Sequence, residues 1–266
     1  MGETVDVERQ GAVATVRMHR GSNNAIAGQL MSELGTAFGE LGEEASVRAI
    51  VLASASERAF SVGADLTAMA GIDRTAEDAV AQVRAILREN HAGYEAIANC
   101  PKPVVAAIGG HALGGGCELA LCCDYRVMVE DGRARIGQTE AALGIMPGAG
   151  GTQRLVRLIG RARALPLLLD GGRLSASEAQ AVGLVDLAVA PEGFAGAVDE
   201  VAARFAKGPT LAIGLIKDAV NRGQDLPLAD ALEIEAENFA RAALSQDAAI
   251  GIMSFLAKQE PEFTGS

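Results

Sequence analysis

Residues 112–124 read ALGGGCELALCCD, three consecutive glycines followed by one glutamate in an otherwise apolar stretch. Burying an unpaired carboxylate is costly, so Glu118 at this place calls for a reason. If a helix begins near Gly114, residues 115 and 118 stand at i and i+3. The free N–H of Gly115 and the carboxylate of Glu118 then lie on one side of that helix. One turn would combine an oxyanion donor, the positive helix end and an acid/base group.

A glycine-rich turn before a helix can also bind phosphate, but the letters around this run do not fit that use. Gly114–Gly116 is not followed by Lys-Ser or Lys-Thr as in a P-loop. Neither this run nor GIMPGAGG at 144–151 has the GxGxxG spacing, so a dinucleotide site is disfavoured. Close packing of a strand on a helix stays open as a purely structural reason for the glycines.

A second glutamate has similar surroundings, because Glu140 follows a glycine turn and precedes three apolar residues. Either glutamate alone would more often be solvated, but two of them beside glycine turns favour an acid/base pair. The loop FSVGADL at 60–66 adds a third element, since its Gly63-Ala64 step can supply a second backbone N–H opposite that of Gly115. By itself this loop glycine is weak evidence, because most such glycines serve turns.

The composition narrows the class of protein. The chain has 266 residues, 49% of them apolar, which suits one large domain or a domain with an appendage. A formal charge of −11 without a basic block gives no support to nucleic-acid binding. The cysteines show no CxxC pairing and are expected to be buried free thiols, and the histidines lack metal-ligand spacing and are expected on loops or the surface. These residues are Cys100, Cys117, Cys122, Cys123, His19, His91 and His111.

Targeting signals are not evident. The opening MGETVDVERQ has no basic region followed by an apolar run, and no stretch approaches the ~18–20 apolar residues of a membrane span. We therefore expect a soluble protein of a reducing compartment, the cytoplasm.

Periodicity predicts an α/β chain with a helical end. Strand-like runs occur at 5–8, 12–18, 48–54, 104–110, 125–129 and 184–191, the first two forming a hairpin. Helical patterns occur at 30–41, about 75–99, 151–160 and after the capping box Ser175–Glu178. From about residue 192 no strand pattern survives, and three or four helices are expected. The apolar run AAIGIMSFLA at 248–257 predicts packing on the core or on another subunit.

Taken together, these segments resemble the enoyl-CoA hydratase/isomerase (crotonase) superfamily from the first strand to the last helix. FSVGADL is similar to the family's F-x-x-G-A-D-[IL], and PKPVVAAIGGHALGGGCELALCCD to its glycine-rich segment. IGQTEAALGIMPGAGGTQRL and SASEAQAVGLVDLAV match two further segments. The resemblance implies an α/β crotonase (ClpP-like) fold of repeated ββα units forming a spiral core over residues 1–195, with the CoA and catalytic site. It implies a C-terminal helical trimerisation region over 196–266.

The resemblance also implies a reaction. The amides of Ala64 and Gly115 would bind the thioester oxygen, and Glu118 and Glu140 would hold a water beside the Cα=Cβ bond. Members with both glutamates are typically hydratases, so the expected activity is addition of water to a 2-trans-enoyl-CoA, a lyase reaction giving a 3-hydroxyacyl-CoA. No cofactor and no metal are expected, since the CoA thioester is the substrate. We expect Glu140 to be the acid and Glu118 to activate the water, with reversed or shared roles left open.

Other readings within and outside this family stay open. An isomerase or a pathway-specific crotonase acting on another acyl-CoA is the first, and a non-catalytic CoA- or RNA-binding relative is the second. The expected partners are an acyl-CoA and further copies of the chain, as a trimer or a hexamer (dimer of trimers), without nucleic acid or membrane.

The resemblance assigns substrate-binding positions as well. They are Asn23, Asn24, Ala25, Ala64, Asp65, Leu66, Thr67, Gly115 and Lys258, with residues 69–91 covering the acyl tail. Thr67 stands where many hydratases have lysine, and Thr139 where proline is common. Asp65 is expected to shape its loop, and Cys117 to be a small helix-packing residue rather than a nucleophile.

Overall fold

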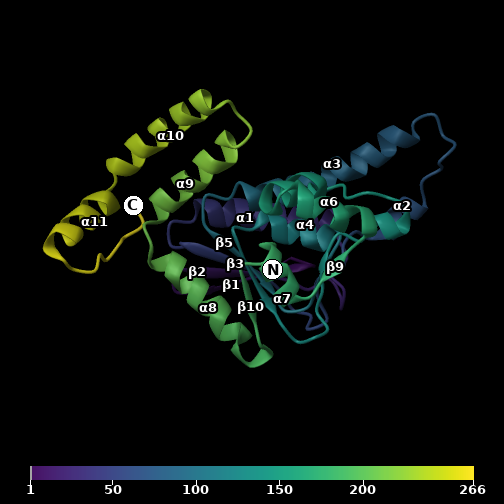
Figure 1. The fold of residues 1–266 in the computed structure, drawn as a ribbon, viewed down its shortest axis with the longest axis horizontal. Helices are drawn as coiled ribbons and strands as arrows, with labels where there is room; N and C mark the ends of the chain where they lie inside the picture. The colour runs from purple at the N-terminus through teal and green to yellow at the C-terminus, as the bar shows by residue number, and fades with distance from the viewer. Residues whose placement is uncertain (1) are drawn as a thin grey trace.

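The computed structural model describes residues 2–266, including all their side chains except those at positions 68 and 69. A six-stranded mixed sheet forms the centre of the molecule (Figure 1). In spatial order its strands are β1 (Val5–Gln10), β2 (Val13–Met18), β3 (Ala49–Ser54), β5 (Val104–Ile108), β7 (Tyr125–Val129) and β10 (Leu187–Val189). Only the β1–β2 pair is antiparallel, as the predicted hairpin requires, and the other pairs are parallel.

A second sheet of four short strands was not predicted. Its strands are β4 (Ala59–Ser61), β6 (His111–Leu113), β8 (Ile136–Gly137) and β9 (Arg173–Leu174). β4, β6 and β8 are mutually parallel, and β9 runs antiparallel to β8. Strands of two or three residues are too short to show an alternating pattern, so periodicity did not reveal them.

The two sheets together explain the repeating unit of the fold. Each of β3, β5 and β7 in the large sheet is followed along the chain by β4, β6 or β8 in the small one. Helix α3 (Ala79–Ala98) follows the first such pair and α4 (Gly115–Cys122) the second. The chain thus winds in ββα turns, and the parallel strands of the small sheet end at one common edge.

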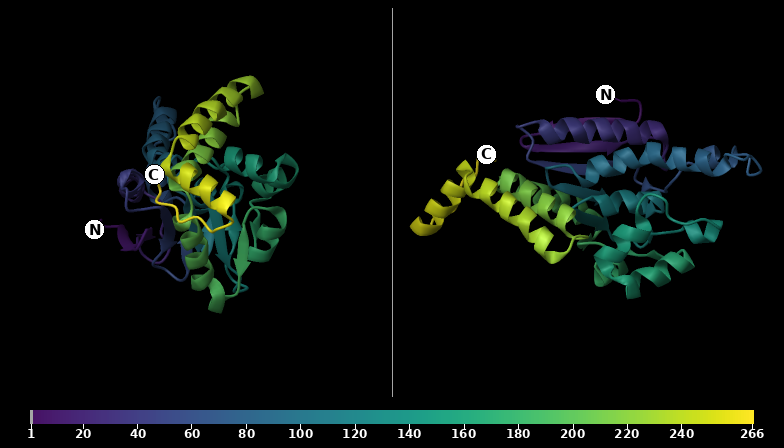
Figure 2. Two further views of the ribbon diagram at one scale, coloured as in Figure 1. Left: turned by 90° about the vertical axis from the view of Figure 1, so that its left-hand side faces the viewer. Right: turned by 90° about the horizontal axis from the view of Figure 1, so that it is seen from above.

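Helices cover both faces of the large sheet (Figures 1 and 2). On one face, α1 (Gly28–Glu43) packs beside α3 and buries Leu30, Leu34 and Phe38, which confirms its predicted apolar stripe. On the other face, α8 (Pro191–Lys207) packs through residues such as Val198 on Val51 of β3. Strands covered on both faces carry continuous apolar runs, which is why β3 and β5 were recognisable in the sequence.

Several boundaries differ from the predicted ones. The helix expected from about residue 75 begins at Ala79, and a short helix α2 (Leu66–Ala70) precedes it. The segment 151–160 opens with a π-helical turn (Gly151–Leu155) before α5 (Val156–Ile159). Downstream lie α6 (Arg161–Asp170) and α7 (Ala176–Val182), the latter with the predicted capping box complete.

The C-terminal helices extend away from the sheets. They are α9 (Thr210–Gly223), α10 (Leu228–Ala243) and α11 (Gln246–Ala257), and they project to one side in Figures 1 and 2. The division predicted after residue 195 falls within α8, which packs on the large sheet, so the projecting part begins at α9. None of the helices within residues 2–266 is both long and apolar enough to cross a bilayer.

Candidate active site

Three segments of the candidate site follow directly from the ends of the small sheet. β4 ends at Ser61, two residues before Gly63; β6 ends at Leu113, just before Gly114; and β8 ends at Gly137, three residues before Glu140. Because these strands are parallel and adjacent, their carboxyl ends meet at one edge. This edge brings together the segments at Gly63, Gly114 and Glu140. The first two lie about fifty positions apart in the chain, and the last two about twenty-five.

Two backbone N–H groups face the space at this edge. Gly115 is the first residue of α4, so its N–H has no acceptor within the helix. Ala64 forms a parallel bridge with Ile26, in which Ile26 N–H donates to Gly63 O and Asp65 N–H donates to Ile26 O, both at 2.8 Å. In such a bridge the N–H of Ala64 itself points away from Ile26. Both Ala64 and Gly115 line the same cavity.

Two glycines are needed for this close approach. Gly63 has φ +96°, and a Cβ there would lie 2.9 Å from Leu113 O and 3.1 Å from Gly115 N. Gly114 has φ +53°, and a Cβ there would lie 2.9 Å from Oε1 of Glu140. A side chain at either position would combine backbone strain with a steric clash. At Gly114, glycine therefore allows both the backbone conformation before α4 and the close approach of the Glu140 carboxyl group.

The carboxyl group of Glu118 is buried and held from one side. Its side chain is 3% exposed, and Oε1 accepts the N–H groups of Ala149 and Gly151, both at 2.7 Å. Burial raises the pKa of Glu118, although the two N–H bonds act in the opposite direction. Since Oε1 is occupied by two donors, Oε2 is the oxygen available for chemistry in the cavity.

Glu140 opens a short 3-10 helix, Glu140–Leu143, and turns its carboxyl group to the same cavity. Burial, followed by repulsion from Glu118, raises the pKa of Glu140 to about 7. The amide of Gln138 lies 3.1 Å from both carboxyl oxygens when its NH₂ group faces them. The predicted convergence of the two glutamates is therefore present, and near neutral pH Glu140 is populated in both protonation states.

The cavity that these groups share has a volume of about 590 Å³. Beyond the glutamates its wall is mostly apolar, formed by α3, the loop after α2 and residues 143–149. The apolar side chains are Ile26, Val62, Leu66, Ile72, Val83, Ile86, Leu87, Leu143, Ile145, Met146 and Pro147. A polar end with an apolar extension suits a molecule that has a reactive carbonyl and a hydrocarbon tail.

Two residues of α3 that the sequence did not assign to the site also line the cavity. The buried hydroxyl of Tyr94 donates to the carbonyl oxygen of Gly115 at 3.2 Å, next to the free N–H of that residue. His91 was expected on a loop or the surface, but it lies in α3, lines the cavity, and its Nε2–H donates to Gly148 O at 2.6 Å. The sequence predicted the helix over about 75–99, but it did not show which face of that helix meets a cavity.

The other predicted binding residues have varied surroundings. Leu66 lines the cavity, whereas Asp65 accepts the N–H and hydroxyl of Thr67 at 3.2 and 2.6 Å and pairs with Arg20 at 2.8 Å. The Thr67 and Arg20 bonds lower the pKa of Asp65 to about 2, so this carboxylate shapes the loop as expected. Thr67 itself is exposed at the start of α2.

The early turn and the C-terminus lie outside the cavity wall. Asn24 is fully buried, with Nδ2 donating to Ser54 Oγ at 2.7 Å, so it anchors the turn and is not accessible to a ligand. The backbone carbonyl of Asn23 accepts a hydrogen bond from Val62 N–H at 3.0 Å, and Ala25 O accepts one from Arg20 at 2.7 Å. Lys258 follows α11 on the projecting helices, so one chain does not bring it to the cavity (Figure 1).

The cysteines behave as the sequence predicted. All four are free and buried. Burial raises the pKa of Cys117 far above its usual range and that of Cys122 to about 12. A thiol that stays protonated is a poor nucleophile, so Cys117 serves as a packing residue beside Glu118.

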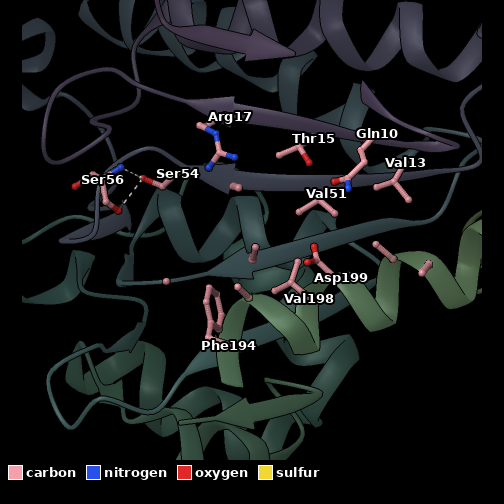
Figure 3. Close-up of a pocket in the computed structure, with 16 residues that line it drawn as sticks. Gln10, Val13, Thr15, Arg17, Val51, Ser54, Ser56, Phe194, Val198 and Asp199 are labelled. Carbon is pink, nitrogen blue, oxygen red and sulfur yellow. Dashed lines mark hydrogen bonds between the residues drawn. The ribbon is translucent and has the colours of Figure 1, made fainter. Parts of the chain in front are cut away.

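A second cavity of about 460 Å³ lies between the large sheet and α8 (Figure 3). Arg17 and Thr15 of β2 border it from one side and Phe194 and Asp199 of α8 from the other. No glutamate is among the described residues that line it. This cavity lacks the acid/base groups of the first and is on the other face of the sheet.

Known proteins resemble this chain in both sequence and fold. Residues 8–266 match the family model "Enoyl-CoA hydratase/isomerase". The chain therefore belongs to the enoyl-CoA hydratase/isomerase family, the crotonase family, and the predicted resemblance and fold class are confirmed.

Individual relatives match over their whole lengths. The chain is 40% identical to a "Probable enoyl-CoA hydratase" of Rhizobium meliloti over 262 residues, 98% of each chain. It is 34% identical to the "Short-chain-enoyl-CoA hydratase" of Clostridium acetobutylicum, covering 97% of this chain and 96% of that one. A crystal structure of an enoyl-CoA hydratase from Bacillus anthracis superposes with a TM-score of 0.90 at 35% identity, covering 99% and 100% of the two chains.

Proposed function

We propose that this protein is an enoyl-CoA hydratase that adds water to a 2-trans-enoyl-CoA and forms a 3-hydroxyacyl-CoA. The observation that carries the proposal is the shared cavity: two backbone N–H groups, of Ala64 and Gly115, and two buried glutamates, Glu118 and Glu140, line it together. Relatives named as short-chain-enoyl-CoA and crotonyl-CoA hydratases support the same reaction.

The N–H groups stabilise the charge that develops during the reaction. When water attacks Cβ, negative charge moves to the thioester oxygen as an enolate forms. Donors fixed on Ala64 and Gly115 bind that oxygen more strongly as its charge grows, and each such donor contributes roughly 10²–10³ in rate. Because Gly115 opens α4, the positive end of the helix adds to this effect.

The glutamates divide the proton transfers. Oε2 of ionised Glu118 accepts a proton from the water as its oxygen bonds to Cβ, and neutral Glu140 donates its proton to Cα. The net change is the addition of one water, and transfer of the proton from Glu118 to Glu140 restores the starting state. General acid–base help of this kind contributes roughly 10²–10⁴ in rate. The pKa of Glu140, about 7, leaves enough of the acid form at neutral pH.

Replacing each glutamate tests the proposal. Glu118→Gln and Glu140→Gln should each lower kcat for hydration of crotonyl-CoA by at least about 10². Loss of enoyl absorbance measures the rate. Glu178→Gln, in the capping box far along the chain, is the matched control for a change of one carboxylate to an amide. Unchanged kcat in both site variants would contradict the proposal, and a substrate panel with 3-enoyl-CoA would show an isomerase instead.

The pH dependence gives a second test of the assigned roles. If Glu140 is the acid, its deprotonation near pH 7 lowers kcat/KM as the pH rises, and the loss is absent from Glu140→Gln. A rate that rises with pH through the same range would reverse the two roles.

We also propose that CoA lies along Ala64 to Thr67. A separate proposal concerns assembly: we propose that the chain forms trimers or hexamers. Within one chain, α10 and α11 leave large apolar side chains uncovered, including Phe239, Leu244 and Phe255 at 72%, 88% and 82% exposure. Such side chains normally pack on a partner. Lys258, at the end of α11, would then have to reach CoA from a neighbouring subunit. A monomer mass in light scattering would contradict the assembly.

A further inference from the structure

A chain of hydrogen bonds links α3 to the carboxyl group of Glu118. His91 Nε2 lies 2.6 Å from Gly148 O, and Ala149 N–H donates to Glu118 Oε1 at 2.7 Å. Gly148 O and Ala149 N–H belong to one peptide group, because the carbonyl of each residue is bonded to the nitrogen of the next. The chain therefore runs from His91 through a single peptide to the glutamate that is proposed to activate water.

The acceptor decides which atom of His91 carries the hydrogen. A backbone carbonyl oxygen can only accept, so Nε2 is the donor in this pair. Both the neutral and the protonated imidazole can carry a hydrogen on Nε2. His91 can therefore hold the peptide on both sides of its own titration.

The peptide transmits the effect of this bond because its two polar groups are conjugated. The resonance that makes a peptide planar moves charge from the nitrogen to the oxygen. A donor on Gly148 O favours this separation of charge and makes Ala149 N–H a stronger donor, since bonds in a chain polarise one another by roughly 10–30%. The peptide is trans, so its C=O and N–H point in opposite directions and His91 and Glu118 lie on its two sides.

A neighbouring contact acts on a different peptide. Arg154, in the π-helical turn, donates from Nη1 to Ala149 O at 3.0 Å. This carbonyl shares its peptide with the N–H of Gly150, whereas the second donor to Glu118 is Gly151 N–H. Arg154 therefore fixes the loop without polarising either donor.

Charged and titratable groups surround the chain on both sides. Behind the loop, His91 borders a separate cavity of about 320 Å³. Two ion pairs line that cavity, Arg154 with Glu95 and Arg157 with Asp225. On the other side, the titratable groups around Glu118 are Tyr94, Cys117, Cys122 and Glu140.

The bonds to Glu118 have more influence on its ionisation than these charges. Burial raises the pKa of Glu118, and the bonds from Gly151 and Ala149 oppose this rise more strongly than the charges of Arg154 and His91 do. A change in the Ala149 bond can therefore affect the ionisation of Glu118 more than the charge of the imidazole does.

We propose that His91 is a positioning residue that keeps Glu118 ionised and in place by acting through the Gly148–Ala149 peptide. This inference rests on the proposed hydratase function, in which ionised Glu118 takes a proton from water. In this role His91 acts on a peptide and not on the reacting atoms.

The pH dependence of hydration tests this role. In the proposed reaction, kcat/KM for crotonyl-CoA falls at low pH as Glu118 becomes protonated, and at high pH as Glu140 loses its proton. His91→Leu removes the donor, so the fall at low pH should move upward by about half a pH unit, and the fall at high pH should move less.

Two further variants separate the hydrogen bond from general damage to α3. The carboxamide of His91→Gln can still donate to Gly148 O, so this variant should recover most of the shift. Arg88→Leu makes a similar polar-to-apolar change at an exposed position three residues earlier on α3, and should leave the pH profile unchanged.

A double-mutant cycle tests the same link without turnover. Urea unfolding at pH 7, at one fixed protein concentration, gives unfolding constants for wild type, His91→Leu, Glu118→Gln and the double variant. The carboxylate is held less strongly when His91 is absent. The effect of Glu118→Gln on the unfolding constant should therefore differ between the two backgrounds by at least about threefold.

The outcomes distinguish this role from the hydratase proposal. A fall at low pH that moves equally in His91→Leu and His91→Gln, or in neither, would overturn the hydrogen-bonded role, as would a change in KM alone. Additive effects in the cycle would overturn it even if crotonyl-CoA is hydrated. Coupling in the cycle without hydration of crotonyl-CoA would support the role of His91 while refuting the hydratase.

Discussion

Glu140 should make the protein less stable as the pH rises, and Glu140→Gln should remove this dependence. The folded protein holds the Glu140 proton with a pKa of about 7, whereas the ordinary value is 4.5. Between these two values the unfolded chain has lost the proton and the folded chain has kept it. Folding stability from this group is therefore full below pH 4.5, falls as the pH rises through this window, and is lowest above about 7.

The size of the effect follows from the same two values. A pKa difference of this size corresponds to about 3 kcal/mol over the whole window, of which roughly 2–3 kcal/mol falls between pH 5 and pH 8. Glu140 is 9% exposed, but its carboxyl group lines a cavity open to water, so solvent screening moves the effect towards the lower end of this range. In Glu140→Gln the repulsion between the carboxyl groups at 140 and 118 is also absent. This loss of repulsion likewise raises the stability of the variant relative to wild type at high pH.

Urea unfolding at pH 5 and pH 8, at one fixed protein concentration, measures the difference. The free energy of unfolding of Glu140→Gln relative to wild type should increase by roughly 2–3 kcal/mol from pH 5 to pH 8. Glu178→Gln should show no such change relative to wild type, because bonds from Ser175 lower the pKa of Glu178 and its titration therefore lies below both pH values. Equal pH dependence in Glu140→Gln and wild type would refute the buried, proton-retaining state of Glu140.

Three further predictions concern Gly114, the hydroxyl of Tyr94 and the buried thiols. Gly114→Ala should lower kcat for crotonyl-CoA by at least about tenfold, because the added Cβ would lie 2.9 Å from Glu140 Oε1 at a φ of +53°. If this variant has the same kcat as the wild type, the loop adapts to the side chain and the prediction is wrong. Tyr94→Phe should lower kcat by roughly tenfold with a smaller change in KM, since the hydroxyl holds the Gly115 peptide at 3.2 Å; an effect confined to KM would assign Tyr94 to tail binding. The four buried thiols should not react with a thiol reagent in the folded protein and should all react in urea, since their pKa values are raised by burial; fast labelling of Cys117 in the native state would contradict its packing role.

Local pattern predicted much of the fold correctly. The strands β2, β3, β5 and β7 and the buried stripe of α1 were visible because each carries its own periodic or continuous apolar pattern over five or more residues. The capping box at Ser175 and the placement of Glu118 one turn into α4 were also readable, since both depend on residues three apart. Interactions that close within one turn need no knowledge of the rest of the chain.

The site itself depends on contacts between distant residues. Strands β4, β6 and β8 are too short to show a pattern, yet their parallel pairing brings Ala64, Gly115 and Glu140 to one edge. The pKa of Glu140 depends on the burial that this convergence produces and on the nearby charge of Glu118.

The sequence alone thus determined which residues are chemically capable: two glutamates beside glycine turns, and a glycine at a helix start. Only the tertiary structure decided that they share one cavity, and that Tyr94 and His91 of α3 line it too. The physical reason is that periodicity records which face of an element is apolar, whereas packing between elements decides whether that face meets the core or a ligand.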